Sequence, residues 1–147
     1  MTDIFTLLKD PDDKKAYAFF KKLKAESEES SIHYNDFEGF AELIQDDSSY
    51  VRTRGFSLCC AQARWDEEGK LRRTLPELMS RLRDEKPTAL RQCMKALYEV
   101  TEYRSELDGM IELGLSEIEF SKYSDSMRPL IRKDIDGLKN RIHKKSM

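Results

Sequence analysis

Three cysteines and two histidines are the side chains of this chain most able to act as nucleophiles or metal ligands. Cys59 and Cys60 are adjacent, so on a helix their side chains would point about 100° apart, and neither forms a C-x-x-C pair with Cys93. His33 and His143 are far apart, and neither begins an H-x-x-x-H pair. These spacings differ from those of zinc and iron–sulfur sites, so the sequence predicts no metal and no other cofactor.

Catalytic motifs are also missing from the sequence. It contains no G-x-x-x-x-G-K-[ST] or G-x-G-x-x-G loop for phosphates and no G-x-S-x-G turn for a nucleophile. Carboxylates are numerous, but pairs at helical spacing arise by chance in so charged a chain. We therefore predict no catalytic residue and a protein that is not an enzyme.

Arginine offers a different chemistry, the binding of carboxylates or phosphates. Arg52, Arg91 and Arg132 each follow an aliphatic residue and a short acidic connection. A ladder of arginines could bind phosphates or an acidic partner. An arginine fork that faces a carboxylate at a helix start can equally lock a turn, and we favour this structural interpretation. The residues expected to form such pairs, within one turn or between neighbouring turns, are Asp46, Asp47, Arg52, Asp84, Arg91, Asp125 and Arg132.

These arginines mark a repeat that extends along the chain. A small or apolar residue follows each arginine by three positions, and a leucine follows three positions later. A weaker copy upstream has Tyr17 in place of arginine, and the four anchors are 35, 39 and 41 residues apart. The aligned sets are Ala16, Phe20 and Leu23; Val51, Gly55 and Leu58; Leu90, Met94 and Leu97; and Ile131, Ile135 and Leu138.

Apolar spacings of three and four predict helices, so each unit reads as helix, short turn, helix. Because one such unit cannot bury its own apolar stripe, neighbouring units must stack. The sequence predicts an all-α fold, a right-handed α-solenoid of about four helix-turn-helix repeats. We expect one domain over residues 1–147, with units at approximately 3–30, 35–66, 70–103 and 105–145. Asp36 is expected to cap the third helix, and Pro76 to lie in the first turn of the fifth.

The segment from Asp47 to Arg52, D-S-S-Y-V-R, resembles the D-x-x-x-V-R junction of HEAT repeats, which belong to the armadillo-type helical repeats. The resemblance covers about residues 3–143, with a departure at Tyr17 and longer turns before Arg91 and Arg132. The chain is also similar to small bacterial single-domain HEAT-like proteins, some of which are labelled as relatives of iron–sulfur scaffold proteins. The resemblance implies a stack in which the second helices line a concave side. It implies little about function, because this scaffold is reused widely.

Residues one helical step away from the core positions are candidates for an interaction surface. Tyrosine and arginine are frequent at binding hot spots, although a solvated helix face explains these residues equally well. For the single tryptophan we favour a buried ring that covers a helix end against the next unit, with its N–H bonded, over an exposed binding anchor. The candidate surface comprises Tyr50, Arg54, Arg64, Trp65, Lys95, Tyr98 and Arg128.

Three functions follow as hypotheses. The first is a non-catalytic scaffold or adaptor that binds a protein or peptide on the concave face. The second is a nucleic-acid-binding protein related to HEAT-like glycosylases of DNA alkylation repair; a net charge of −2 disfavours it. The third is an accessory protein in iron–sulfur cluster assembly, which would depend on the cysteines.

Location and assembly are the remaining expectations. The first residues lack the basic and apolar regions of a signal peptide, and no apolar run approaches the roughly 20 residues that span a membrane. Three cysteines, two of them adjacent, make a poor disulfide framework. We expect a cytoplasmic protein without a membrane partner, either a monomer or a homodimer.

Overall fold

The computed structural model describes residues 3–83 and 85–145, and within these ranges the chain is helical and contains no strand. The predicted all-α class is therefore confirmed. The α-helices are α1 (Ile4–Leu8), α2 (Asp13–Glu29), α3 (Phe37–Glu42), α4 (Ser49–Ala61), α5 (Lys70–Leu82), α6 (Pro87–Tyr103), α7 (Asp108–Ser116) and α8 (Arg128–Lys145). Short 3₁₀ helices join them, η1 (Ser31–Asp36), η2 (Leu43–Gln45), η3 (Ala63–Trp65) and η4 (Ser105–Leu107).

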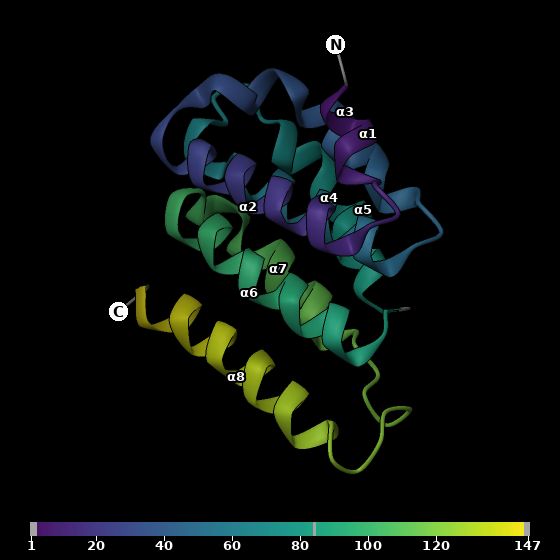
Figure 1. Cartoon of the computed structure of the whole chain (residues 1–147). Helices are drawn as coiled ribbons and strands as arrows, with labels where there is room; N and C mark the ends of the chain where they lie inside the picture. The colour runs from purple at the N-terminus through teal and green to yellow at the C-terminus, as the bar shows by residue number, and fades with distance from the viewer. Residues whose placement is uncertain (1–2, 84, 146–147) are drawn as a thin grey trace.

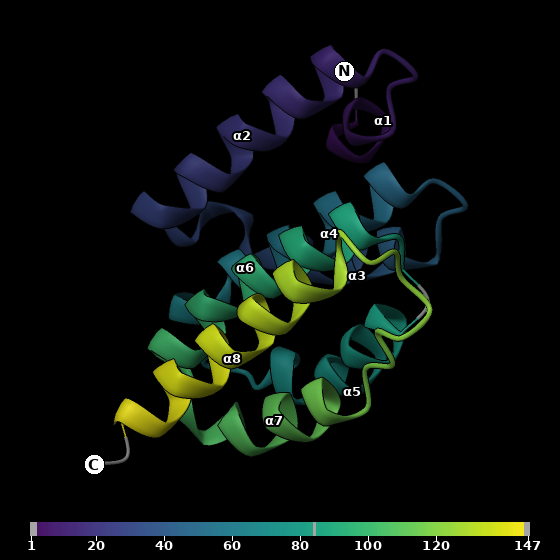
Figure 2. The same cartoon turned by 90° about the horizontal axis from the view of Figure 1, so that it is seen from below.

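The even-numbered helices lie next to one another in chain order. Helix α2 packs against α4, α4 against α6, and α6 against α8. Helices α5 and α7 pack against each other behind them (Figure 1), and the view from below shows them on the far side of α6 and α8 from α2 (Figure 2). Helix α4 also contacts α3 and η2, so it is covered on several sides.

The repeated apolar positions form the core. Leu58, Leu97 and Leu138 are fully buried, as the repeat alignment predicts. Burying one such leucine contributes about 1.5–3 kcal/mol relative to leaving it exposed. Gly55 lies where α4 closely approaches α3 and η2 of its own unit, because a Cβ placed there would be 2.6 Å from both the Phe40 carbonyl oxygen and the Leu43 Cβ. The small residue in this unit therefore lets α4 sit deep against α3.

Polar side chains define the helix starts, though not always the expected ones. The Ser48 hydroxyl accepts a bond from the Val51 amide at the start of α4. Asp36 occupies the N-cap position of α3, as expected, but its side chain makes no capping bond, because η1 ends at Asp36 and runs directly into α3. Pro76 lies in the middle of α5 rather than in its first turn. Asp66 explains the earlier start, because its carboxylate accepts the amides of Lys70 and Leu71 at 2.9 and 3.0 Å.

The three cysteines lie in the interior, Cys59 and Cys60 on α4 and Cys93 on α6. Cys59 and Cys60 are fully buried and Cys93 is 2% exposed, and all three are free thiols. Burial raises the pKa of each thiol well above its ordinary value, so the thiols stay protonated at neutral pH. Among the described residues, no group of three or more histidine, cysteine or acidic side chains is placed to hold a metal ion. Nor does that part of the chain contain a helix long and apolar enough to cross a membrane.

Candidate binding groove across α2, α4 and α6

A groove of about 510 Å³ runs across the face formed by α2, α4 and α6. Helices α2 and α6 form its walls, and α4 forms its floor because it is set back against α3. This volume lies in the range of ligand-binding clefts. The lining residues are Asp13, Lys14, Tyr17, Phe20 and Lys24 from α2; Tyr50, Thr53, Arg54 and Ser57 from α4; and Gln92, Lys95 and Ala96 from α6.

The floor of the groove is polar although it is buried. Thr53, Arg54 and Ser57 are 8%, 5% and 7% exposed. The Thr53 hydroxyl donates to the Ser49 carbonyl oxygen at 2.7 Å, which satisfies it within α4. Polar side chains are rarely buried unless they are bonded or serve a ligand. The floor therefore differs from the apolar faces that α4 turns toward α3 and α6.

Arg54 is the buried cation of this floor, which corrects the expectation that it faces solvent. The apolar periodicity predicts a core on one side of α4, whereas α1 and α2 also cover this helix. The guanidinium donates to the Leu8 carbonyl oxygen at 2.9 Å and to the Asp13 carboxylate at 3.3 Å. The Arg54 side chain is 6% exposed, but that of Asp13 is 58% exposed. The buried positive charge is thus balanced by one solvated carboxylate.

Lysines on both walls make the groove positive. Lys14 and Lys24 come from α2, and Lys95 comes from α6. Lys14 and Lys95 are exposed and Lys24 is half-buried. Together with Arg54 they give four positive groups against one negative group, Asp13, which is the one carboxylate among the described residues that line the groove. A concave surface with this balance attracts anionic groups.

Aromatic rings lie beside these charges. Tyr17 and Tyr50 are 52% and 63% exposed, which is unusual for large aromatic side chains. The ring of Phe20 lies 6.0 Å from that of Tyr17, and the Lys21 ammonium lies 5.1 Å from the Tyr17 ring centre. Exposed tyrosines in a concave site offer large contact area at a small cost in conformational entropy.

Of the seven residues predicted to form an interaction surface, the structure brings Tyr50, Arg54 and Lys95 together in this groove. Arg64 and Trp65 lie in η3 and tie it to the C-terminal end of α2. Arg64 donates to the Glu28 carbonyl oxygen at 2.8 Å and to the Glu99 carboxylate at 3.0 Å. Trp65 is half-buried, and its indole N–H donates to the Ser27 carbonyl oxygen at 2.6 Å. The expected indole bond is present, but it joins the preceding unit, not the next.

Two further predicted residues, Tyr98 and Arg128, make their contacts outside the groove. Tyr98 is half-buried between α6 and α8, and a Cβ at Gly137 would lie 2.9 Å from its hydroxyl. Arg128 donates to the Tyr123 carbonyl oxygen at 3.0 Å and to the Asp125 carboxylate, so it closes the turn before α8. Neither residue reaches the groove.

Sequence reasoning missed the wall contributed by α2. Lys14, Tyr17 and Lys24 recur on one face of that helix at spacings of three and seven. The available signal was Tyr17, which stands where the other units have arginine. Reading it only as a weak repeat anchor hid the exposed aromatic side chain beside two lysines.

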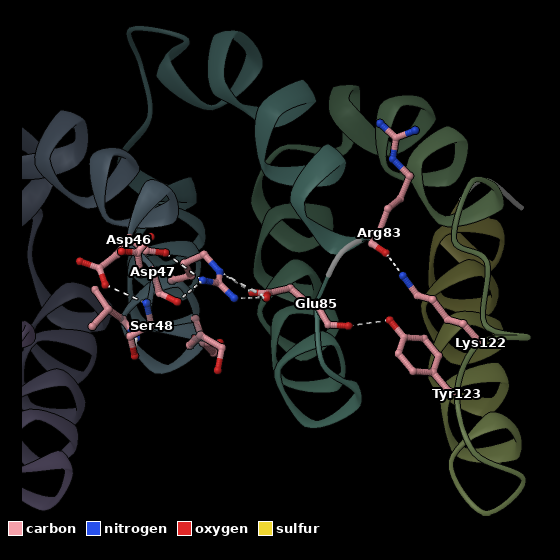
Figure 3. Close-up of polar contacts among 11 residues, drawn as sticks. Asp46, Asp47, Ser48, Arg83, Glu85, Lys122 and Tyr123 are labelled. Atoms are coloured by element: carbon pink, nitrogen blue, oxygen red, sulfur yellow. Dashed lines mark hydrogen bonds and ion pairs between the residues drawn. The ribbon is translucent and has the colours of Figure 1, made fainter.

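The second polar region lies at the turns that precede α4, α6 and α8 (Figure 3). Arg52 donates to the carbonyl oxygens of Asp46 and Asp47, each at 2.8 Å, and its guanidinium also meets the Glu85 carboxylate at 2.6 Å. The bond that Arg52 donates to the Glu85 carboxylate raises the pKa of Arg52. Tyr123 donates its hydroxyl to the Glu85 carbonyl oxygen at 2.6 Å. Three successive turns are joined in this way.

The partners of these arginines differ from those expected. The carboxylate partner of Arg52 is Glu85 from the next turn, while Asp46 bonds the Ser48 amide at 2.9 Å. Arg91 pairs with Asp134 of α8 at 2.7 Å. The Asp125 carboxylate accepts from Arg128, and the Arg132 guanidinium lies 4.7 Å from the Phe120 ring centre. Asp84 lies outside the described residues. The bonds from Arg52 to Glu85 and from Arg91 to Asp134 therefore cross between units, which a single-unit motif cannot specify.

Comparison with known proteins gives no match to any family model, curated protein or solved structure.

Proposed function

We propose that this chain is a non-catalytic scaffold that binds a segment of another protein in the groove across α2, α4 and α6. The observation that carries the proposal is a buried, polar floor beneath two exposed tyrosines. The groove offers ammonium, guanidinium, hydroxyl, amide and aromatic groups beside the one carboxylate of Asp13, a mixture that suits recognition of a flexible chain. Neighbouring anchors on three helices also fit a ligand longer than a single small molecule.

We further propose that the scaffold is a short HEAT-like solenoid. Contacts between each even-numbered helix and the next support this assignment, as do the repeated apolar positions in the core. In such a stack the second helices form a continuous concave side, and the groove lies on α2, α4 and α6 of that side. The free, buried cysteines are in keeping with a reducing, cytoplasmic setting.

Nucleic acid is the second candidate ligand. Lysines beside exposed aromatic rings are the combination that binds phosphates and stacks on bases, and this favours single strands over duplex. The overall charge of −2 weighs against it, because nucleic-acid binders normally present an extended basic surface. A role in iron–sulfur assembly draws no support from the cysteines, since all three are buried and protonated.

Capture from a lysate of the native host tests the main proposal. The immobilised wild-type chain is compared with Lys14→Glu/Lys95→Glu, which reverses two groove charges. Lys133→Glu/Lys144→Glu on α8 makes the same change in net charge at exposed positions that do not line the groove. We expect a protein that survives nuclease treatment, is retained by the wild type and the α8 variant, and is lost from the groove variant. Nuclease-sensitive material would favour nucleic acid, and equal capture by all three chains would contradict the groove.

A further inference from the structure

We propose that the bound segment is acidic and that one of its carboxylates takes the place of Asp13 on Arg54. This inference rests on the proposed function and names the chemistry of the partner. It starts from the charge balance at the floor of the groove, where a buried guanidinium meets a largely solvated carboxylate.

Arg54 is a buried cation, which needs a charged partner and hydrogen bonds. A buried charge is costly unless it is paired and hydrogen-bonded. Arg54 has five N–H donors; one bond goes to the neutral Leu8 carbonyl and one to Asp13 at 3.3 Å, near the long end of the range. A second or better-placed carboxylate would complete the neutralisation of this cation.

Asp13 is suited to being displaced from Arg54. It is the first residue of α2, and its side chain is 58% exposed. Ion pairs with a solvated member contribute little net free energy. Because Asp13 lines the groove, its charge also repels any other carboxylate that approaches Arg54. Asp13 therefore satisfies Arg54 in the free protein and competes with an acidic ligand.

Other residues of the groove can contact the rest of the segment. Lys14 and Lys24 on one wall and Lys95 on the other can receive further carboxylates. The exposed rings of Tyr17 and Tyr50 leave a contact surface for one apolar or aromatic side chain. The groove thus fits an acidic segment with an aromatic residue among its carboxylates. Opposite charges across such an interface chiefly give specificity and fast association.

A peptide explains the groove better than nucleic acid does. Nucleic-acid binding draws on several phosphate contacts spread along a strand, whereas this groove gathers three lysines around a buried guanidinium. The planar fork of arginine pairs well with a carboxylate. A buried arginine aimed at one anion is better matched to a single acidic side chain than to a continuous phosphate backbone.

The test is a titration of the ¹⁵N-labelled full chain, monitored by the amide resonances of Thr53, Arg54 and Ser57. The first probe is a blocked heptapeptide, Glu-Glu-Asp-Phe-Asp-Glu-Glu. The second replaces its acids with their amides, Gln-Gln-Asn-Phe-Asn-Gln-Gln, and the third is a seven-nucleotide oligothymidine. We expect the acidic peptide to shift the floor amides with at least about fivefold higher affinity than its neutral analogue, and less strongly as salt is raised.

Variants then test the displacement of Asp13. Asp13→Asn should tighten binding of the acidic peptide by about two- to fivefold, because it removes a competitor worth little by itself. Glu29→Gln, an equal change of charge at the exposed end of the same helix, should leave the affinity unchanged. Arg54→Gln should abolish the preference for the acidic peptide. Should that variant fail to fold, Lys14→Gln/Lys95→Gln provides a second test, with a loss of at least threefold expected.

The outcomes separate this inference from the proposed function. If both peptides shift the floor amides equally and Asp13→Asn changes nothing, the groove binds peptides but the acidic assignment is wrong. Binding of oligothymidine alone would overturn the inference and the peptide-binding function together. So would an absence of shifts with all three probes.

Discussion

Arg52 and Arg54 lie two residues apart on α4, yet they belong to different regions with different bonding. Arg52 faces the turns that precede α4 and α6, and its guanidinium is bonded to two carbonyl oxygens and to the Glu85 carboxylate. Arg54 faces the groove, with one carbonyl and one solvated carboxylate. The side chain of Arg52 is the more exposed, 20% against 6%. Burial alone therefore does not identify a structural arginine, whereas the completeness of its bonding does.

The largest expected effect comes from removing the carboxylate that pairs with Arg52. Glu85→Gln leaves Arg52 partly buried without its carboxylate, and we expect the free energy of unfolding to fall by about 3 kcal/mol. Urea denaturation measures it. Glu117→Gln is the matched control, because Arg83 and Glu117 form an ion pair at 3.5 Å with both side chains nearly half exposed. That change should cost less than about 0.5 kcal/mol, and equal losses would contradict a structural role for Arg52.

The next effect concerns the depth at which α4 sits against α3 beneath the groove. Gly55→Ala would place a Cβ 2.6 Å from the Phe40 carbonyl oxygen, so α4 must move away from α3 toward the groove. We expect a loss of about 2 kcal/mol in the free energy of unfolding. Gly109→Ala in α7, where a Cβ would meet nothing within 4 Å, should instead gain up to about 1 kcal/mol from helix propensity. Calorimetric unfolding of both variants checks the contrast; similar losses would mean that Gly55 does not set the depth of the groove.

A smaller effect is expected on the groove side. Arg54→Gln should lower the free energy of unfolding by about 1 kcal/mol, since it removes few bonds and also removes a poorly balanced buried charge. Arg52→Gln should cost about 3 kcal/mol in the same urea assay, because Glu85 is then left buried and unpaired. If the two substitutions cost the same, both arginines are structural, and the binding role assigned to Arg54 loses its support.

The smallest expected effect is a pH dependence of the free energy of unfolding, at the ion pair between Arg64 and Glu99. Arg64 meets Glu99 at 3.0 Å, yet burial raises the pKa of Glu99 above its ordinary 4.5, against the opposing bond from Arg64. A raised pKa in the folded state gives stability that is present below pH 4.5 and is lost as pH rises through the folded value. Relative to wild type, Glu99→Gln should therefore gain stability between pH 4.5 and pH 7 in thermal unfolding. Glu67→Gln, an equal change of charge at an exposed position, is the control.

The helices and the buried leucines were predictable because they depend on local periodicity. Leu58, Leu97 and Leu138 follow from spacing alone, and they are fully buried. The partner of Arg52 was not predictable, since Glu85 lies 33 residues away and meets it only when two units are packed together.

The groove was predicted only in part, for the same reason. Tyr50 and Lys95 were identified from the outward face of their helices, whereas Arg54 was expected in solvent. Its burial depends on how α1 and α2 cover α4, which helical periodicity does not contain. The only sign of the α2 wall in the sequence was Tyr17, which stands at a repeat position that is arginine in the other units.

The buried cysteines can report on local opening of the helix packing. A water-soluble thiol reagent can reach the buried Cys59, Cys60 or Cys93 only when the packing around α4 and α6 opens, so the labelling rate measures how often the folded chain opens there. Labelling that proceeds in native buffer, well below the denaturant midpoint, would reveal a local opening; labelling that tracks global unfolding would show that this seam opens only when the whole chain does. The chain thus carries three natural probes of local opening, and no engineered label is required.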